Sequence, residues 1–358
     1  TFVYYNCSLR KKILDGKIPG EKIMINDTLP FIDLHRHLDG SIRLETILEL
    51  GRKFNIPLPA EDLEGLIPFV QITEPRPGVM AFIEKFKYMI GVLADYDACR
   101  QIAFENVEDA VREGIDYIEL RFSPVFMSEP HGLSPEGIVE AIIEGVNQAQ
   151  KKYDVLVNLI GIISRTYGPD LGWKELESLL MYKDQIVALD LAGDERNFPG
   201  KLFIDHIQEG RSAGWNITIH AGEDAGPDSI WQAVEELNAD RIGHCISAVQ
   251  DPELMRYLAE EQIGVECNLT SNVQTRVVEN YSSHPLKIFL EEGILATINS
   301  DDPGISGINL KYEYETAAPA AGLSPGLIKQ AQKNSLEVAF LSENEKQKLR
   351  QKAEKRRK

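Results

Sequence analysis

Eight short apolar runs rich in β-branched residues recur along the chain, and a helical pattern follows each of them. They span Phe31–His35, Tyr117–Ser123, Leu156–Ser164, Ile186–Gly193, Ile217–Glu223, Arg241–Ile246, Gly264–Ser271 and Ile294–Asp302. Nearly continuous apolar strands that alternate with helices are typical of a parallel sheet buried on both faces. Eight such units predict an α/β fold, a (β/α)8 TIM barrel. A doubly wound open sheet fits less well, because polar residues end many strands instead of clustering at one switch point.

The connection between the first two predicted strands is long, at about eighty residues, where a barrel needs only one helix. Helical patterns near Ser41–Phe54, Met80–Leu93 and Ala98–Glu113 predict extra helices inserted between these strands. Extra helices in such a connection lie over the barrel mouth, where the chemistry takes place. We therefore expect the Ser41–Phe54 helix to act as a lid.

The sequence predicts one domain, residues 28–345, with a short segment at each end. Residues 1–27 contain no continuous apolar segment followed by a small-residue cleavage site, so we expect an N-terminal extension of unknown role and not a signal peptide. Ser342 and Glu345 fit a capping box that begins the last helix. The basic run at 346–358 is expected to be a C-terminal tail, the solvated and frayed end of that helix.

The charge balance and the cysteines exclude several classes of protein. The 38 basic and 56 acidic residues give a formal net charge of −18, whereas a nucleic-acid surface needs a clustered basic field. No apolar run is long enough for a membrane-spanning helix. The four cysteines are far apart and form no CxxC pair, which is typical of a reduced, cytoplasmic protein. Among oligomeric states, a monomer is favoured.

Two histidines end the first predicted strand, in the sequence His35-Arg36-His37. Alternate residues of a strand point to the same face, so both imidazoles project into the barrel mouth. Two imidazoles held this close suit a borderline-soft divalent metal such as zinc. An HxH pair alone is a weak signal, so the interpretation depends on what the other strand ends contribute.

Ionisable residues also end three other predicted strands. His220 and Glu223 end the fifth, His244 lies in the sixth, and Asp301 and Asp302 end the eighth. Barrel topology brings these strand ends together above the core. Ionisable groups buried there as mere core filling would be costly, which favours a functional site.

The residue types at these strand ends suit a single catalytic zinc ion. His35, His37 and His220 supply three imidazoles and Asp301 a carboxylate, and such sites keep a position open for water. The fourth strand contains Asp190 but no lysine that could help bridge two metals, so we favour one metal. The remaining histidines fall in a loop, a helix and a turn, where structural roles are expected; they are His131, His206 and His284.

At these residues the chain resembles the adenosine deaminases of the metal-dependent amidohydrolase superfamily, most closely the bacterial ones. The shared motifs run in family order from about Leu29 to about Ser342: HRHLDGSI, RFSP, SRT, DLAGDE, HAGE, RIGH, LTSN and SDDPG. This series is specific to the family, although no single motif would be. The chain departs from the family pattern at Cys245, where many relatives carry Gly, and at Cys267-Asn268-Leu269; neither change touches a predicted ligand.

The resemblance implies a role for each of nine residues. The ligands of one Zn²⁺ per chain would be His35, His37, His220 and Asp301. Glu223 would protonate N1 of the purine, and its pKa should therefore be raised. His244 would lie beside the attacking water, which Asp302 would help to steer while it holds N7. The substrate would also contact His37, the backbone of Gly193 near N3, and Asp39 near the ribose 5′-hydroxyl.

The resemblance thus implies zinc-dependent hydrolytic deamination of adenosine, and of 2′-deoxyadenosine, to inosine and ammonia in purine salvage. Adenine deaminase is the alternative, but its members usually carry Glu in place of Asp39, reading HIEG where this chain reads HLDG. AMP deaminases are larger, and no basic cluster for a phosphate is evident. A catalytically silent barrel would have lost a ligand or the acid. A secreted growth-factor-like deaminase needs a signal peptide, and the H-x-E, P-C-x-x-C deaminases need a cysteine pair.

Overall fold

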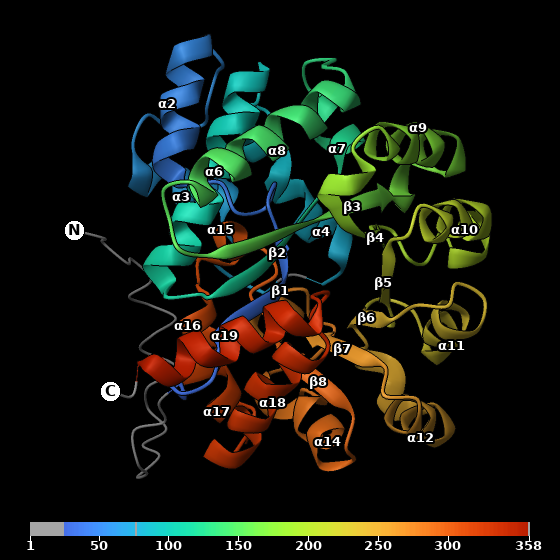
Figure 1. Cartoon of the computed structure of the whole chain (residues 1–358). Coiled ribbons are helices and arrows are strands. Elements are labelled where there is room, and N and C mark those ends of the chain that lie inside the picture. The colour runs from blue at the N-terminus through green and yellow to red at the C-terminus, as the bar shows by residue number, and fades with distance from the viewer. Residues whose placement is uncertain (1–24, 76, 357–358) are drawn as a thin grey trace.

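The computed structural model describes residues 25–75 and 77–356, and a barrel of eight parallel strands forms its centre (Figure 1). The strands are β1 (Ile32–His37), β2 (Tyr117–Phe122), β3 (Leu156–Ser164), β4 (Ile186–Ala192), β5 (Asn216–Ala221), β6 (Arg241–His244), β7 (Gly264–Cys267) and β8 (Leu295–Ile298). Each strand pairs with the next in sequence order. Backbone hydrogen bonds of 2.8 Å from His37 to Asp301 and from Asp301 to His35 nearly close the ring. The predicted TIM barrel is confirmed.

Helices surround the strands, and the connection between β1 and β2 holds the largest group. It contains α2 (Leu44–Phe54), α3 (Leu63–Val70), α4 (Val79–Ile83), the 3₁₀ turn η1 (Glu84–Phe86), α5 (Lys87–Ile90) and α6 (Tyr96–Glu113). The predicted insertion of extra helices is confirmed. The single helix expected near Met80–Leu93 is instead divided into α4, η1 and α5, because the backbone tightens into a 3₁₀ turn in its middle.

The other helices follow the remaining strands in order. They are α7 (Pro124–Ser128), α8 (Pro135–Gln150), α9 (Pro169–Leu180), α10 (Ile204–Ser212), α11 (Pro227–Glu235), α12 (Pro252–Glu260), α13 (Leu269–Gln274), α14 (Leu286–Glu291), α15 (Pro303–Ser306), α16 (Leu310–Tyr312), the π-helix η7 (Glu313–Ala317), α17 (Ala318–Ala320), α18 (Pro325–Glu337) and α19 (Glu343–Lys355). Most of their apolar faces pack in one large core, and Leu336 of α18 and Leu349 of α19 belong to a second, smaller cluster with β1 and β2. None of the described helices is long and apolar enough to cross a membrane.

Several predicted strands extend too far at their carboxyl ends, and the seventh and eighth do so by four residues each. The seventh ends at Cys267, and part of its expected length forms α13; the eighth ends at Ile298. Short apolar runs do not distinguish a strand from a buried helical turn, which explains the first error. After the eighth, Asp301 adopts a left-handed backbone with φ of 60°, so the chain turns away from the strand direction at the first of the two aspartates.

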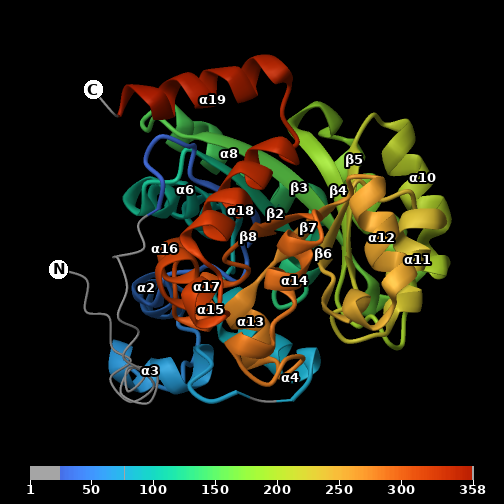
Figure 2. The ribbon, with the colours of Figure 1, turned by 90° about the horizontal axis from the view of Figure 1, so that it is seen from below.

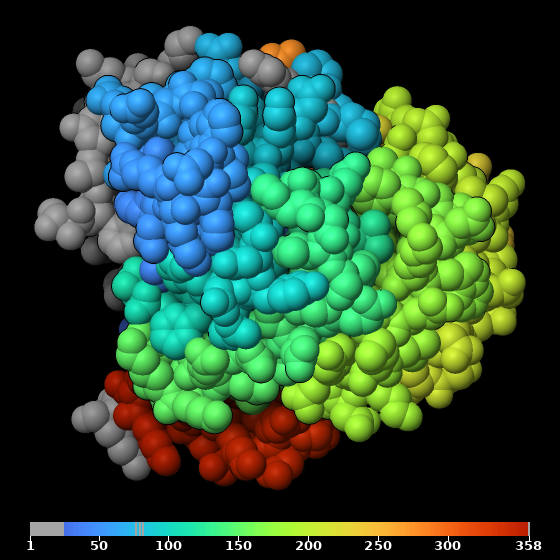
Figure 3. Space-filling view, turned by 90° about the horizontal axis from the view of Figure 1, so that it is seen from above, coloured from blue at the N-terminus to red at the C-terminus, as the bar shows by residue number. Residues whose placement is uncertain are grey.

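The described part of the basic run at 346–358 is a helix end, as expected, but one of its faces is packed and not solvated. Residues 346–355 belong to α19, where the predicted capping box of Ser342 and Glu345 is present. Leu349 is buried in an apolar cluster with β1 and β2, and Arg356 forms an ion pair with the buried Asp116. Figures 2 and 3 show α19 at the opposite end of the molecule from α3 and α4.

The N-terminal extension predicted at 1–27 lies outside the described residues up to position 24, and its boundary stays a prediction.

Charged side chains fill part of the barrel interior. The carboxylate of Glu266 on β7 accepts hydrogen bonds from Arg121 (2.8 Å), Arg241 (2.7 Å) and Thr218 (2.9 Å). Arg241 also donates to Glu119 and to the carbonyl of Val338. All these side chains are buried. Buried charges are tolerated only when they are paired and hydrogen-bonded, so the residues of this network depend on one another.

We predict that Arg241→Met lowers the free energy of unfolding by about 3–5 kcal/mol, because Glu119 would be left buried without its cationic partner and Glu266 would keep only Arg121. Denaturant unfolding followed by circular dichroism measures the change. The matched control is Arg256→Met on α12, where the arginine is exposed and its ion pairs are weak. Equal stabilities of the two variants would contradict a structural role for the buried network.

Candidate active site

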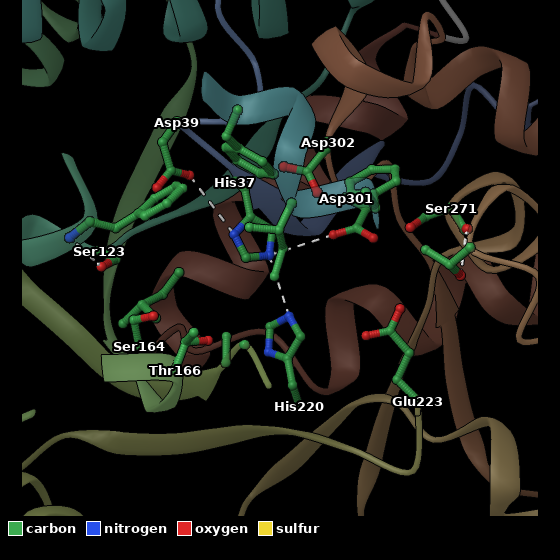
Figure 4. Close-up of a pocket in the computed structure, with 18 of the residues that line it drawn as sticks. His37, Asp39, Ser123, Ser164, Thr166, His220, Glu223, Ser271, Asp301 and Asp302 are labelled. Carbon is green, nitrogen blue, oxygen red and sulfur yellow. Dashed lines mark hydrogen bonds and ion pairs between the residues drawn. The ribbon is translucent and has the colours of Figure 1, made fainter. Parts of the chain in front are cut away.

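The nine residues singled out from the sequence meet at one pocket, at the carboxyl ends of the strands (Figure 4). Eight of them line it: His37, Asp39, Gly193, His220, Glu223, His244, Asp301 and Asp302. The ninth, His35, is fully buried against His220, with ring centroids 4.6 Å apart. The geometry therefore unites every sequence-predicted site residue, while the role of each stays a prediction.

Two of the histidines are fixed by carboxylates on the side away from the pocket. His35 Nδ1 lies 2.6 Å from Glu266 Oε2, and His220 Nδ1 lies 3.0 Å from Asp190 Oδ1. A carboxylate on one ring nitrogen of a histidine orients the other nitrogen towards a metal and raises its basicity. Asp190, which the sequence left uncertain, thus lies behind a histidine and does not itself face the pocket. Its second oxygen accepts from Arg121 at 2.8 Å.

The free nitrogens of these rings converge with an aspartate on a single point. Asp301 Oδ1 lies 3.3 Å from His35 Nε2 and 3.5 Å from His37 Nε2. His37 Nε2 also lies 3.3 Å from His220 Nε2. Among the described residues, the buried His35 Nε2 faces Asp301 Oδ1 but makes no well-aligned hydrogen bond, and such an atom is costly unless it binds something. Three imidazole nitrogens and a carboxylate oxygen are a donor set that zinc prefers.

The protonation states of these groups also suit a cation. Burial lowers the pKa of His37 well below its ordinary value and lowers that of His220 as well. Burial opposes the ionisation of Asp301, but the hydrogen bond and charge of His35 outweigh it and hold the pKa of Asp301 well below its ordinary value. Neutral imidazoles beside an ionised carboxylate are the forms that bind metals, as His37, His220 and Asp301 provide. For His35, burial opposes the charged form, but the contacts with Asp301 and Glu266 raise its pKa, so a metal would replace the proton of this ring.

His244 also lies close to this cluster, because one of its ring nitrogens is within 4.8 Å of a ligand atom of His35 and of His220. Its Nε2 is 3.6 Å from Glu223 Oε2, so this nitrogen faces the acid side of the pocket. His244 and Cys245 have φ values of 62° and 61°. Two successive left-handed residues end β6 abruptly, and such strain in non-glycine residues concentrates at functional sites. Cys245 itself packs in the apolar core and does not line the pocket.

Three carboxyl groups in the pocket lie in surroundings that favour the protonated acid. Burial raises the pKa of Glu223 well above its ordinary value, and the charges of Asp301 and Glu195 add to this effect. The expected raised pKa of Glu223 is thus confirmed. Burial, followed by the charge of Asp301, likewise raises the pKa of Asp302. Burial raises the pKa of Asp39 to about 7.

The sequence analysis missed Glu195, the residue that holds the Glu223 loop in place. Its carboxylate accepts hydrogen bonds from four successive backbone amides: those of Gly222 (2.5 Å), Glu223 (3.2 Å), Asp224 (3.0 Å) and Ala225 (3.1 Å). It also accepts from the hydroxyl of Ser229. A carboxylate on a row of amides fixes a loop firmly, because each bond is charge-assisted. The signal available in the sequence was the last residue of the DLAGDE motif, which carried no assigned role.

Aromatic side chains form the outer wall of the pocket, and they do not come from the helix expected as the lid. Phe82 and Ile83 of α4 and Phe86 of η1 line the pocket, together with Phe126 of α7. No residue of α2 does so among those described, and Leu48 of α2 is buried in the core beneath. The lid predicted at Ser41–Phe54 therefore does not line the pocket. The apolar face of α2 packs in the core beside α3, and Thr46 bonds Glu105 of α6.

Gly193 lies at the end of β4 with φ of 105°, where the backbone itself lines the pocket. A Cβ atom added here would lie 2.5 Å from Thr166 Oγ1, so only glycine allows this approach.

The structural roles expected for other histidines also receive support: His206 stacks on Trp173 at 4.1 Å, and His131 bonds the carbonyl of Gly91 at 2.7 Å.

Comparison with known proteins gives a consistent result. The family model described as adenosine deaminase matches residues 30–356. The adenosine deaminase of Escherichia coli O1:K1 / APEC is 56% identical over 329 residues, which cover 92% of this chain and 99% of that protein. The solved structure of an adenine deaminase from Arthrobacter aurescens matches with a TM-score of 0.85 and 25% identity, covering 91% of this chain and 98% of that one. An amidohydrolase from Burkholderia ambifaria with bound Zn shares the fold, with a TM-score of 0.81, 24% identity, and coverage of 91% and 90%.

We predict that Glu195→Gln loosens the loop that carries Glu223. An amide side chain has one acceptor oxygen and no charge, and it cannot satisfy four backbone donors and a hydroxyl. Hydrogen exchange of the amides at 222–225, measured by mass spectrometry, should accelerate about tenfold or more. Glu209→Gln on the exposed face of α10 is the matched control and should leave these amides unchanged. Slow exchange in both variants would show that Glu195 does not hold the loop.

Proposed function

The chain belongs to the adenosine deaminase family and is a hydrolase that deaminates adenosine, and we propose that the nine pocket residues carry out this reaction around one zinc ion. The observation that carries the proposal is a set of close contacts beside an acid whose pKa is raised. His37 Nε2 lies 3.3 Å from His220 Nε2 and 3.5 Å from Asp301 Oδ1, and His35 Nε2 lies 3.3 Å from the same oxygen. The products would be inosine and ammonia, which places the enzyme in purine salvage.

His35, His37, His220 and Asp301 would hold the metal. Their fit rests on His35 Nε2, which makes no well-aligned hydrogen bond among the described residues, and on the carboxylates behind His35 and His220. Zinc in such a site supplies a nucleophilic water by lowering its pKa to about 7. The fourth-strand residue Asp190 is already engaged by His220 and Arg121, which supports one metal and not two.

Glu223 would donate a proton to N1 of the purine, which makes C6 electrophilic enough for attack. A general acid must be protonated when the substrate is bound, and the raised pKa of Glu223 supports this state at neutral pH. The amides held by Glu195 keep the acid in place before substrate arrives. Such preorganisation is a large part of enzymatic rate acceleration.

His244 and Asp302 would orient the attacking water, and Asp302 would also hold N7. The Asp302 side chain lies against Gly40, where a Cβ atom would come within 1.6 Å of its Oδ1. That oxygen is buried without a hydrogen-bond partner among the described residues. A raised pKa, caused by burial and by Asp301, leaves Asp302 able to donate a hydrogen bond to a purine nitrogen.

The rest of the pocket suits an uncharged nucleoside. Phe82, Phe86 and Phe126 provide apolar faces for a flat base, with Phe86 and Phe126 in edge contact at 5.4 Å. The backbone of Gly193 would donate to N3, His37 would contact the substrate beside the metal, and Asp39 would bind the ribose 5′-hydroxyl. The described lining contains no lysine or arginine, which favours a nucleoside over a nucleotide. Adenine is the alternative substrate, and Asp39 favours adenosine because it would contact the sugar.

We also propose that a single chain suffices for activity and that it works in the cytoplasm. All nine residues come from one chain, so no partner subunit needs to complete the site. The cysteines that the structure describes, Cys99, Cys245 and Cys267, are free and buried, which suits a reducing compartment.

We predict that the purified protein binds about one zinc per chain and that a chelator abolishes the deamination of adenosine. Loss of adenosine absorbance measures the rate, and added zinc should restore it. With adenine or AMP in place of adenosine, kcat/KM should fall about 10²-fold or more, because binding energy from the sugar is lost or a phosphate is left unpaired. Comparable activity on 2′-deoxyadenosine is expected. Absence of stoichiometric metal, or faster turnover of adenine, would contradict the assignment.

We predict that Glu223→Gln retains zinc but lowers kcat about 10²- to 10⁴-fold, because the amide cannot donate a proton to N1. Metal analysis and steady-state kinetics with adenosine test both parts. The exposed Glu235→Gln on α11 is the control and should keep the full rate. A Glu223→Gln variant with nearly unchanged kcat would remove this residue from the acid role.

A further inference from the structure

A chain of buried hydrogen bonds runs from the start of α14 to His244. The backbone amide of Leu286 donates to His284 Nδ1 at 3.1 Å, and His284 Nε2 lies 3.2 Å from Asn272 Oδ1. Asn272 Nδ2 then lies 2.9 Å from His244 Nδ1. None of the roles assigned above uses His284 or Asn272. The sequence predicted only a structural role in a turn for His284 and did not indicate its contact with Asn272.

The direction of every bond in this chain is set by the backbone amide at its end. An amide N–H can only donate, so His284 Nδ1 accepts and carries no proton. The single proton of that ring is then on Nε2, which donates to the carbonyl oxygen of Asn272. This orients the Asn272 amide, and its nitrogen must donate to His244 Nδ1. Reversing the amide would bring its NH₂ group against the Nε2–H of His284, donor against donor.

Two further observations agree with this direction. Burial lowers the pKa of His284 to about 3, so a neutral ring is expected throughout the working range of the enzyme. The amide nitrogen of Asn268 lies 3.4 Å from the same His244 Nδ1, so a second donor faces this atom. Both amides come from the segment around the start of α13, which follows β7.

We propose that His284 and Asn272 are positioning residues that hold His244 as the neutral tautomer with its proton on Nε2. A nitrogen that accepts a hydrogen bond bears no proton, so His244 Nδ1 is unprotonated. This excludes the tautomer with its proton on Nδ1 and the imidazolium, which has a proton on both nitrogens. Its Nε2 faces the pocket beside Glu223. The tautomer itself does not depend on the proposed function. Its consequence for the reaction does: His244 donates a hydrogen bond to the attacking water and does not take a proton from it at Nε2.

The direct test is the nitrogen spectrum of the intact zinc-loaded protein labelled with ¹⁵N-histidine. Two- and three-bond proton–nitrogen correlations distinguish a protonated ring nitrogen from an unprotonated one. The signals of His244 and His284 are identified by their loss in His244→Gln and His284→Gln. We expect both rings to carry their proton on Nε2. A proton on Nδ1 of His244 in the resting protein would overturn the proposal, whether or not the protein deaminates adenosine.

Substitution of Asn272 by aspartate tests the relay itself. A carboxylate only accepts, so in Asn272→Asp the proton of His244 should move to Nδ1, and kcat should fall about 10²-fold because a donor to the reacting oxygen is lost. KM and zinc content should change little, which separates this effect from a disrupted site. The matched control is Asn280→Asp: this exposed side chain uses its oxygen to accept from Ser282 and Ser283, which aspartate can also do. An unchanged His244 spectrum in Asn272→Asp would overturn the relay.

The His284 step has its own pair of variants. His284→Gln can still present an N–H to Asn272, whereas His284→Phe cannot. The glutamine variant should therefore keep the His244 tautomer and most of kcat, and the phenylalanine variant should show both His244 tautomers and a lower kcat. Equal behaviour of the two variants would remove His284 from the relay. A protein without deaminase activity would refute the proposed function, while the nitrogen spectra would still decide the tautomer.

Discussion

The carboxylate of Glu266 connects the interior of the barrel to the base of the active site. One of its oxygens accepts from Arg241 and Thr218, and the other accepts from Arg121 and from His35 Nδ1 at 2.6 Å. The same group thus neutralises the buried arginines and orients a predicted metal ligand. The charges of Arg121 and Arg241 hold the pKa of Glu266 well below its ordinary value despite its burial. The stability of the fold and the geometry of the site are therefore coupled.

The pocket affects its carboxyl groups in opposite directions. It lowers the pKa of Asp301 and raises the pKa of Glu223 and Asp302. Asp301 interacts with His35, whose contact and charge favour the ionised carboxylate. Glu223 has no lysine or arginine partner among the described residues and meets the negative charges of Asp301 and Glu195. Burial acts on both groups in the same direction, so the neighbours decide the difference. Groups of one chemical type, held in contrasting surroundings, can then serve as metal ligand and as acid.

Two segments that follow strands are each fixed by a buried polar side chain from elsewhere in the sequence. Glu195 after β4 holds the amides of the Glu223 loop after β5. Asn272 after β7 bonds His244 at the end of β6. Barrel enzymes place chemistry on such loops because the strands hold their bases rigidly. Here the loops also fix one another, which suits a site that needs little rearrangement to bind its substrate.

The sequence by itself determined the fold class, the order of the strands and seven of the nine residues that meet in the pocket, because apolar periodicity and strand-end polar residues are local signals. The other two, Asp39 and Gly193, followed only from the resemblance to the family. It did not reveal Glu195, Asn272, His284 or the arginine pairs of Glu266, and it misplaced the lid and the packing of the last helix. Those features arise from contacts between residues far apart in the chain, such as Arg241 with Glu119 and His35 with Glu266. Only the tertiary structure decides which buried polar groups become partners, because each must be satisfied by whatever the fold brings beside it.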